Sequence, residues 1–263
     1  MTRRVYTRLV PFTAEVVGRF AREAIAAGEG EVCALLRHGF YLRFPGERYA
    51  CAGARALGCG PLNALLAPFA MPRLGERVAI EARAAVPWAP PPLARSGPPA
   101  VEALERAASG RVPKEGLGCL ITGALNSVAT HAQPALEALD HWLVGHALER
   151  EAEALVGLGP GFTPSGDDFL GGMLVALRAC ARATQAQSLW RWLEPRLAGR
   201  TSAISAAHLA AAAQGEAHEA LHACLQALFG NGGWDEALGR LDGVGHFSGW
   251  DALAGAVAVA RRA

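Results

Sequence analysis

The sequence predicts an α+β protein in which an antiparallel β-rich, barrel-like N-terminal part precedes a mostly α-helical part. Short apolar segments separated by turn residues fill the chain as far as Val86. A proline-rich run over residues 87–99 then interrupts this pattern, because proline fixes φ and removes a hydrogen-bond donor. Beyond it, apolar residues recur at helical spacing. We therefore expect a β-rich domain over residues 1–92 and a helical domain over residues 93–263.

The N-terminal domain is expected to begin with a helix and to continue as strands. Val17, Phe20 and Ala24 share one face of a helix predicted over residues 16–27, and Gly28 ends it. Turn residues then separate short strand-like segments, a spacing that favours a small antiparallel sheet or barrel. These segments are residues 31–36, 40–44, 49–54, 61–66 and 77–86.

The C-terminal domain carries apolar residues at helical spacing. The longest such pattern runs from Leu136 to Leu158 and predicts one long helix. An alanine-rich helix is expected to stop near Gly215. The other predicted helical segments are residues 101–108, 117–128, 188–197 and 216–229.

The composition excludes several classes of protein. Hydrophobic residues make up 51% of the chain and charged residues 19%, so a substantial core is expected. A net charge of +1 without a basic tract argues against a nucleic-acid or anionic membrane surface. We expect no signal peptide, because Arg8, Pro11 and Glu15 interrupt the segment after the basic start, and no membrane helix, because no apolar run reaches the required length. The six scattered cysteines predict reduced thiols and a cytoplasmic protein.

The run from Gly157 to Gly172, G-L-G-P-G-F-T-P-S-G-D-D-F-L-G-G, is the most informative stretch of the sequence. Its glycines permit positive φ and a close approach to a ligand. The helical pattern that follows puts a helix N-terminus, with unpaired N–H groups, at the end of the loop. We expect a substrate-binding loop that includes Gly159, Gly161, Thr163, Ser165 and Gly166. A capping box alone would explain Ser165 and Asp168, but not the adjacent Asp167.

A second copy of this motif lies near the C-terminus. Residues 165–172 and 248–255 both read S-G-x-D-x-L-x-G, and an arginine follows each copy at the same offset. Gly172 and Gly255 would let the two helix axes come close. If the two helix N-termini converge, they form one electropositive anion pocket that adds Gly245, Ser248 and Gly249. The alternative is a pair of glycine-packed helices with ordinary caps.

Two further segments are candidates for the same pocket. Arg200 precedes three hydroxyl residues, Thr201, Ser202 and Ser205, at a predicted helix start, where they would complete an anion site or simply cap the helix. Asn63 follows Gly60-Pro61-Leu62 and would face the pocket or belong to a tight turn.

Residues 218–222 read H-E-A-L-H, which matches the zinc-protease pattern HExxH. Asp242, Asp251 or His246 would have to supply the third ligand. The pattern is short, and the glycine turn of the metzincins is absent. A zinc protease is therefore the less favoured interpretation of this segment.

With these two glycine-rich motifs, the chain resembles a family formerly of unknown function that includes the AllH subunit of oxamate carbamoyltransferase. The G-P-L-N segment (60–63), the W-x-P segment at Trp88 and the T-S-x-I-S segment (201–205) extend the resemblance. It implies phosphorolytic exchange between oxalurate plus phosphate and oxamate plus carbamoyl phosphate. It also implies partner subunits, as in a multi-subunit enzyme of anaerobic allantoin breakdown.

The residues make such a transfer chemically reasonable. Helix N-termini would supply oxyanion donors, and His246 would act as general acid or base, assisted by Asp167, Asp168 and Asp251. Because Asp167 and Asp168 would repel an anion, a Mg²⁺ ion bridging them to phosphate is one solution; in the other, one aspartate caps the helix and its neighbour orients His246. A metal-dependent hydrolase of a phosphorylated or amide substrate and a non-catalytic ligand-binding subunit remain alternatives.

Overall fold

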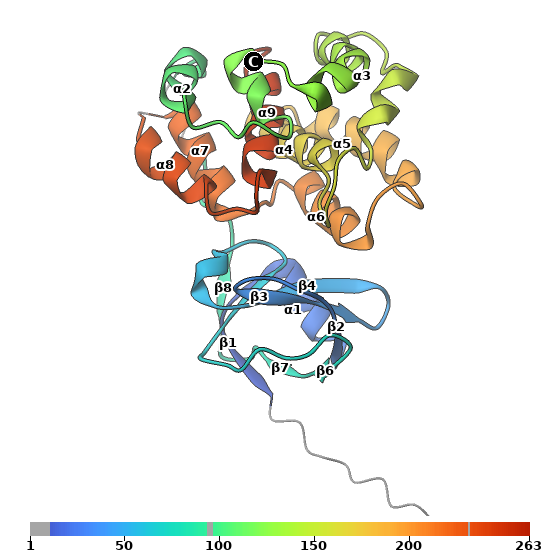
Figure 1. Cartoon of the computed structure of the whole chain (residues 1–263), viewed down its shortest axis with the longest axis vertical. Coiled ribbons are helices and arrows are strands. Elements are labelled where there is room, and N and C mark those ends of the chain that lie inside the picture. The colour runs from blue at the N-terminus through green and yellow to red at the C-terminus, as the bar shows by residue number, and fades with distance from the viewer. Residues whose placement is uncertain (1–10, 94–96, 231) are drawn as a thin grey trace, which may run out of the picture. The chain divides into compact units, whose positions relative to one another are not determined.

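The computed structural model describes residues 11–93, 97–230 and 232–263 (Figure 1). The chain divides into two compact units, Met1–Ala89 and Pro90–Ala263. The first unit is built from strands and the second from helices. The predicted α+β class, a barrel-like β part followed by a helical part, is thereby confirmed. None of the helices in the described residues combines the length and the apolar character needed to span a membrane.

The first unit is an eight-stranded sheet that curls until its ends almost meet. Its strand order is β6-β2-β3-β4-β5-β1-β7, and β8 pairs with β1. Only Ala79 separates β6 from β7, so the two ends of the sheet lie next to each other along the chain. The strands are β1 (Phe12–Gly18), β2 (Gly30–Leu35), β3 (Gly39–Phe44), β4 (Arg48–Gly53), β5 (Asn63–Leu66), β6 (Arg77–Val78), β7 (Ile80–Glu81) and β8 (Val86–Trp88).

The sheet is mixed, because β4–β5, β1–β7 and β1–β8 pair in parallel and the other pairs are antiparallel. Alternate side chains of its strands, such as Phe40, Leu42 and Phe44, fill a core of its own. The expected helix over residues 16–27 is shorter, because Val16, Val17 and Gly18 belong to β1 and pair with β8. The helix α1 covers Arg19–Ile25.

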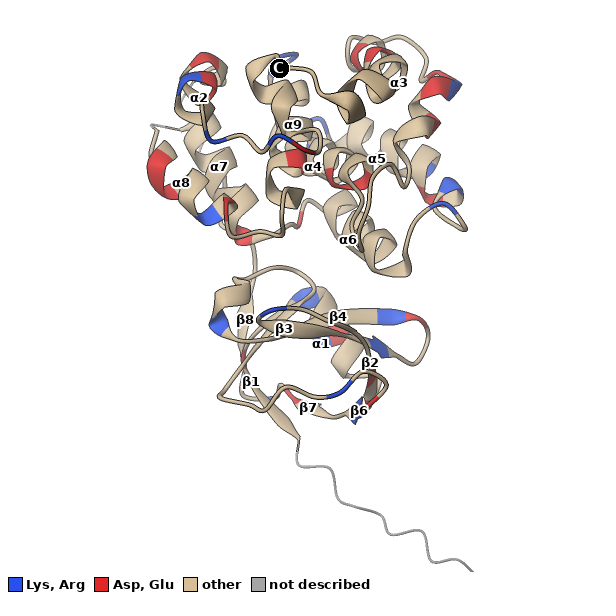
Figure 2. Cartoon of the chain, viewed as in Figure 1, with Lys and Arg blue, Asp and Glu red and all other residues tan. Residues whose placement is uncertain are grey.

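The second unit is helical throughout, with α4 and α9 at its centre (Figure 1). Charged residues concentrate on its outer elements (Figure 2). The helices are α2 (Val101–Ala108), α3 (Ser127–Leu143), α4 (Ser165–Ala179), α5 (Ala183–Leu193), α6 (Ala203–Ala213), α7 (Glu219–Phe229), α8 (Trp234–Leu241) and α9 (Ser248–Ala260). Short 3₁₀ turns are η1 (Arg55–Leu57) in the first unit, and η2 (Gly118–Thr122), η3 (Arg150–Leu155) and η4 (Glu194–Arg196) in the second.

The single helix expected over residues 136–158 is wrong. Asn126 accepts a hydrogen bond from the N–H of Ala129 and caps α3 much earlier, and α3 ends at Leu143. Gly145 follows with φ +106°, a conformation that stops a helix and that glycine adopts without strain. A loop and η3 then carry the chain to Gly157.

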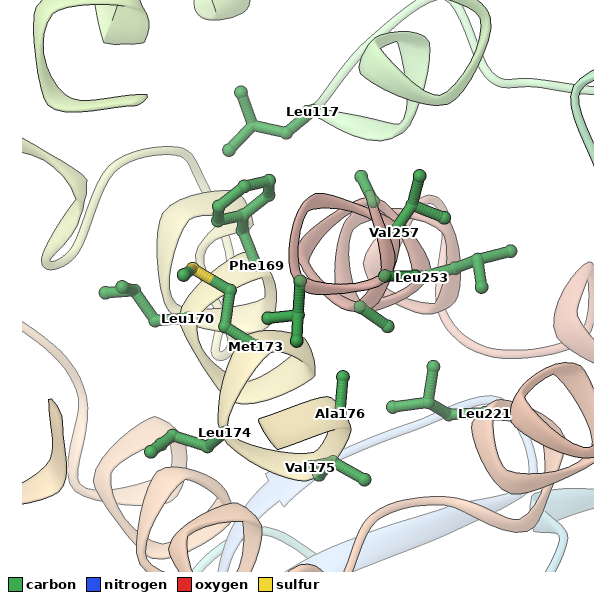
Figure 3. Packing of buried hydrophobic residues seen from close by; sticks show 14 of the residues in the cluster. Leu117, Phe169, Leu170, Met173, Leu174, Val175, Ala176, Leu221, Leu253 and Val257 are labelled. Atoms are coloured by element: carbon green, nitrogen blue, oxygen red, sulfur yellow. The ribbon is translucent and has the colours of Figure 1, made fainter. Parts of the chain in front are cut away.

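The core of the second unit is centred on the contact between α4 and α9. Phe169 and Met173 of α4 and Leu253 and Val257 of α9 lie around this contact (Figure 3). All four side chains are almost completely buried. This packing fixes the two helices against each other, and with them the two glycine-rich motifs at their starts.

Candidate functional site

The glycine-rich loop, residues 157–164, uses three glycines in the left-handed region of φ. Gly157, Gly159 and Gly161 have φ values of +76°, +110° and +98°. A Cβ on Gly157 would overlap the carbonyl of Arg200, and one on Gly159 would press on Ser165. The N–H of Gly166 donates to the carbonyl of Leu158 at 2.9 Å and closes the loop onto the first turn of α4. Glycine is therefore required at Gly157 and Gly159 for both conformation and space.

Asp167 ties this loop to the start of α6. Its Oδ1 accepts a hydrogen bond from the N–H of Gly157 at 2.8 Å. Its Oδ2 accepts one from Ser205 Oγ at 2.6 Å and a second from Thr201 Oγ1. The side chain is 1% exposed, so these three donors replace its water. Ser202 completes the connection by capping α6 and donating to the carbonyl of Phe162 at 2.5 Å.

Asp251 plays a corresponding role at the start of α9. It is completely buried, and its Oδ1 accepts hydrogen bonds from the N–H groups of Leu117 and Gly118 at 2.6 and 2.9 Å. Gly116, with φ +76°, packs so closely that an added Cβ would lie 2.5 Å from Asp251 Oδ1. The segment before η2 thus lies directly on the Asp251 carboxyl group.

The two motifs contact each other reciprocally. A Cβ on Gly172 would overlap the carbonyl of Ala252, and a Cβ on Gly255 would overlap the carbonyl of Phe169. Phe169 and Ala252 occupy the same position of their respective motifs, so one contact is made twice. The predicted close approach of the two helices at their glycines is present.

The hydroxyl group of each motif lies beside a carboxyl group of the other motif, so this contact is also made twice. The hydroxyl group of Ser165 lies near Asp251 of the other motif and lowers its pKa, and that of Ser248 does the same for Asp168. Thr163 Oγ1 lies 3.2 Å from Ser248 Oγ and also lowers the pKa of Asp168. The first turns of α4 and α9 therefore converge on one polar cluster.

Burial perturbs both carboxyl groups of this cluster. It raises the pKa of Asp168 well above its usual range, opposed by the hydrogen bond from Ser248 and reinforced by the nearby charge of Asp251. Burial also raises the pKa of Asp251 to about 6, although hydrogen bonds from Ser165, Leu117 and Gly118 oppose the rise. Within the described residues, the Oδ2 atoms of Asp168 and Asp251 are buried and have no hydrogen-bond partner. Both carboxyl groups are thus harder to ionise than an exposed aspartate, and burial is the main cause for each.

The structure brings most of the expected site residues to this cluster or to the loop and the α6 start that adjoin it. These residues are Gly159, Gly161, Thr163, Ser165, Gly166, Asp167, Asp168, Thr201, Ser202, Ser205, Ser248, Gly249 and Asp251. Gly245 lies beside Ser248 with φ +62°, and the neighbouring His246 is exposed in the turn before α9.

Two expected site residues are committed to other contacts. The guanidinium group of Arg200 pairs with Glu153 at 3.0 Å, and Glu153 also binds Arg196. Asn63 lies in the first unit, where its Nδ2 donates to the carbonyl of Gly58 at 2.9 Å. Its contact is that of a tight turn, the alternative weighed for this residue.

The sequence did not point to Gly116, Leu117 and Gly118, which enclose Asp251. Their only signal was a pair of closely spaced glycines.

The residues that the structure describes contain no group of three His, Cys, Asp or Glu side chains able to hold a metal ion. The H-E-A-L-H segment shows why. His218 precedes α7 as its N-cap, and its Nδ1 accepts from the N–H of Ala220 at 3.1 Å. His222 is buried, and its Nε2 accepts from the N–H of Ala217 at 3.1 Å. One ring nitrogen of each histidine thus already accepts from the backbone, and no third ligand completes a zinc site among the described residues.

The fold and the site define a class of two-part protein: a barrel-like sheet is followed by a helical unit. In the helical unit, two helices that begin with the same motif cross at their glycines. A family model described as oxamate carbamoyltransferase subunit AllH matches residues 155–260, a segment that contains both copies. This match supports membership of the chain in the AllH family, as the two motifs predicted. No curated protein and no solved structure matches the chain.

Proposed function

We propose that this chain is a subunit of a carbamoyltransferase that binds small anionic substrates at the converging N-termini of α4 and α9. The substrates proposed are oxalurate and phosphate, and the products are oxamate and carbamoyl phosphate. The observation that carries this proposal is the pairing across the two helix starts. Ser165 of α4 lies beside Asp251 of α9, and Ser248 of α9 lies beside Asp168 of α4. The family match over the same segment supports the transfer of a carbamoyl group in particular.

The two carboxyl groups, both with raised pKa values, supply the proton-transfer chemistry that this reaction needs. A phosphate oxygen attacks the carbamoyl carbon of oxalurate and forms a C–O bond. The bond from this carbon to the oxamate nitrogen breaks, and that nitrogen must receive a proton. Asp168, whose pKa is raised by burial, is suited to give this proton, whereas Asp251 stays ionised between two N–H donors.

The raised pKa of Asp168 favours its neutral form, which weakens the repulsion that two adjacent carboxylates would exert on an anion. The carboxyl group of Asp167 accepts three hydrogen bonds from the chain itself, so its oxygens are already engaged. The Mg²⁺ bridge proposed for Asp167 and Asp168 is therefore not needed for anion binding. Full activity of Asp167→Asn without dependence on added metal would exclude this bridge.

Exposed His246, next to Ser248, remains our second candidate for proton transfer. The donors that would stabilise the developing oxyanion are the first N–H groups of α4 and α9. We place the complex in the cytoplasm, because all six cysteines carry free thiols.

A ligand-binding subunit without catalysis is the second candidate function. It is favoured by the use of Asp167 and of the Asp251 Oδ1 atom in hydrogen bonds that hold the chain together. Substitution of Asp168, the proposed proton donor, separates the two functions. It should lower turnover if the chain is catalytic, and it should affect only binding if the chain is a ligand-binding subunit.

The experiment is to express the chain with its partner subunits and to measure carbamoyl phosphate formation from oxalurate and phosphate. Binding of phosphate, oxamate and oxalurate by the chain alone is measured in parallel. We expect Ser165→Ala and Ser248→Ala to lose binding, and Asp168→Asn to bind substrate but lose turnover. Arg106→Met, an exposed change on α2, is the control. Normal turnover in Asp168→Asn would contradict its role as proton donor, and normal binding in both serine variants would contradict the site.

A further inference from the structure

Residues 111–118, here called the strap, are fixed at both ends to the start of α9. At one end, Arg111 binds Asp242 at 2.8 Å, and Asp242 also accepts from Nε1 of Trp250 at 3.0 Å. At the other end, the N–H groups of Leu117 and Gly118 donate to Asp251. The middle of the strap is thereby held close to the polar cluster of α4 and α9.

Lys114 lies in the middle of the strap, and its backbone is also fixed. Nδ2 of Asn126 donates to the carbonyl of Lys114 at 3.0 Å and to that of Gly116 at 2.8 Å. Two residues of chain span at most about 7 Å, so Lys114 cannot lie far from Gly116, which touches Asp251. A lysine side chain is long enough to reach the first turn of α9 from there.

The side-chain contacts of Lys114 distinguish it from the paired arginines of the chain. The side chain is exposed, and it makes no hydrogen bond or ion pair to any residue in the described ranges. By contrast, the guanidinium group of Arg111 in the same strap is paired with a carboxylate, and so is that of Arg200. A fixed backbone that carries an uncommitted cation beside a polar cluster is the arrangement expected of a ligand-binding residue.

Lys114 is also the only lysine among the 25 basic residues of the chain. Arginine serves at every other basic position. Lysine differs in offering a compact point charge on a flexible stem, which suits a phosphate or carboxylate that arrives and leaves in each cycle.

The cluster beside the strap contains a polar atom that lacks a partner. Asp251 is completely buried, and its Oδ2 has no hydrogen-bond partner among the residues that the structure describes. Unpaired buried polar atoms are rare in folded proteins, and a ligand that carries an N–H or O–H donor beside its anionic group is one way to satisfy this acceptor.

We propose that Lys114 is a substrate-binding residue whose ammonium group contacts the anionic group of the substrate at the start of α4 and α9. This inference rests on the proposed function, because it adds a contact to the same site. The ligand class is a small anion that carries a phosphate or a carboxylate group.

The test measures binding of two probes, inorganic phosphate and oxamate, to the full chain by calorimetric titration. The variants are Lys114→Met, Lys114→Arg, Ser165→Ala and the matched control Arg106→Met, which also removes one exposed positive charge. We expect the dissociation constant of at least one probe to rise about tenfold or more in Lys114→Met, with partial recovery in Lys114→Arg. The probe affected identifies which anionic group Lys114 contacts.

A second readout uses the single lysine. Reductive methylation labels only Lys114 and the α-amino group, and mass spectrometry quantifies each. We expect the bound anion to slow labelling of Lys114 but not that of the α-amino group. If Ser165→Ala loses binding while Lys114→Met keeps it, the inference is overturned and the proposed function stands. If neither probe binds the wild type, the proposed function is overturned together with the inference.

Discussion

At the scale of single residues, the buried carboxyl group of Asp251 makes stability depend on pH. Its pKa of about 6 in the folded protein lies above the ordinary value of 3.8. Between these two values the unfolded chain loses its proton first, so the free energy of unfolding falls as pH rises from about 4 to 6. Above pH 6 both states are ionised, and the loss stays constant at about 3 kcal/mol.

Asp251→Asn keeps an acceptor for Leu117 and Gly118 but cannot ionise. We therefore expect this variant to match the wild type near pH 4 and to exceed its unfolding free energy by up to about 3 kcal/mol above pH 6. Urea unfolding at a series of pH values measures the difference. Asp251→Ala, which leaves both N–H groups unpaired, should be less stable at every pH. A difference between the Asn variant and the wild type that does not change with pH would contradict the raised pKa.

Asp167→Asn tests the connection between the glycine-rich loop and α6. The substitution replaces Oδ2, which accepts from Thr201 and Ser205, with a donor. We expect a loss of about 1 to 3 kcal/mol in unfolding free energy, measured by urea unfolding. Thr201→Ser retains the hydroxyl group and should change little. Equal stability of Asp167→Asn and the wild type would mean that the connection contributes nothing.

At the scale of elements, two adjacent glycines of α4 provide a matched pair of variants. A Cβ on Gly172 overlaps the backbone of α9, whereas a Cβ on Gly171 meets only Leu209 and Ala212 at ordinary distances of 3.7 and 3.8 Å. We expect Gly172→Ala to destabilise the protein by about 3 kcal/mol or more, because α4 and α9 must separate. Gly171→Ala should be neutral or slightly stabilising, since alanine favours helix.

Thermal unfolding of the two alanine variants, side by side, measures this difference. Gly255→Ala should behave like Gly172→Ala, because it overlaps the carbonyl of Phe169 in the reciprocal contact. Equal stability of the variants at Gly171 and Gly172 would contradict the close crossing of α4 and α9.

The sequence predicts elements well where local pattern decides them. The starts of α4 and α9, and the glycines at their crossing, followed from the repeated motif alone. The helix expected over residues 136–158 is wrong because the apolar spacing continues past Gly145, whereas the left-handed φ of this glycine stops α3. The helix expected from Val16 failed because β-branched residues there pair with β8, a tertiary contact that local pattern does not contain.

Only the site residues that belong to a local sequence motif were predictable from the sequence. Ser165, Asp168, Ser248 and Asp251 stood out in their motifs. The contact between Asp251 and Leu117 spans 134 positions of sequence, and no local signal records it. For the same reason the sequence suggested a metal or catalytic role for Asp167, whose partners Thr201 and Ser205 lie more than thirty positions away.

At the scale of the whole molecule, we propose that the β-rich and helical parts fold as separate domains, with the boundary at residues 92 and 93. The proline-rich connector around Pro91 and Pro92 is exposed, and each part has its own core. We expect limited trypsin digestion to cleave first at Arg95 and to leave two resistant fragments, which mass spectrometry identifies. Fragments that are degraded as fast as they appear would contradict two independent domains.

The reciprocal crossing of α4 and α9 has the contact pattern of a two-fold symmetric dimer, in which every contact occurs twice. In a dimer of identical chains, any substitution changes both halves at once. Here both halves lie in one chain, so each position is free to differ: Asp167 binds the glycine-rich loop, whereas Trp250, at the same motif position, binds Asp242. Because one chain supplies both halves, the reciprocal crossing can have two chemically unequal sides.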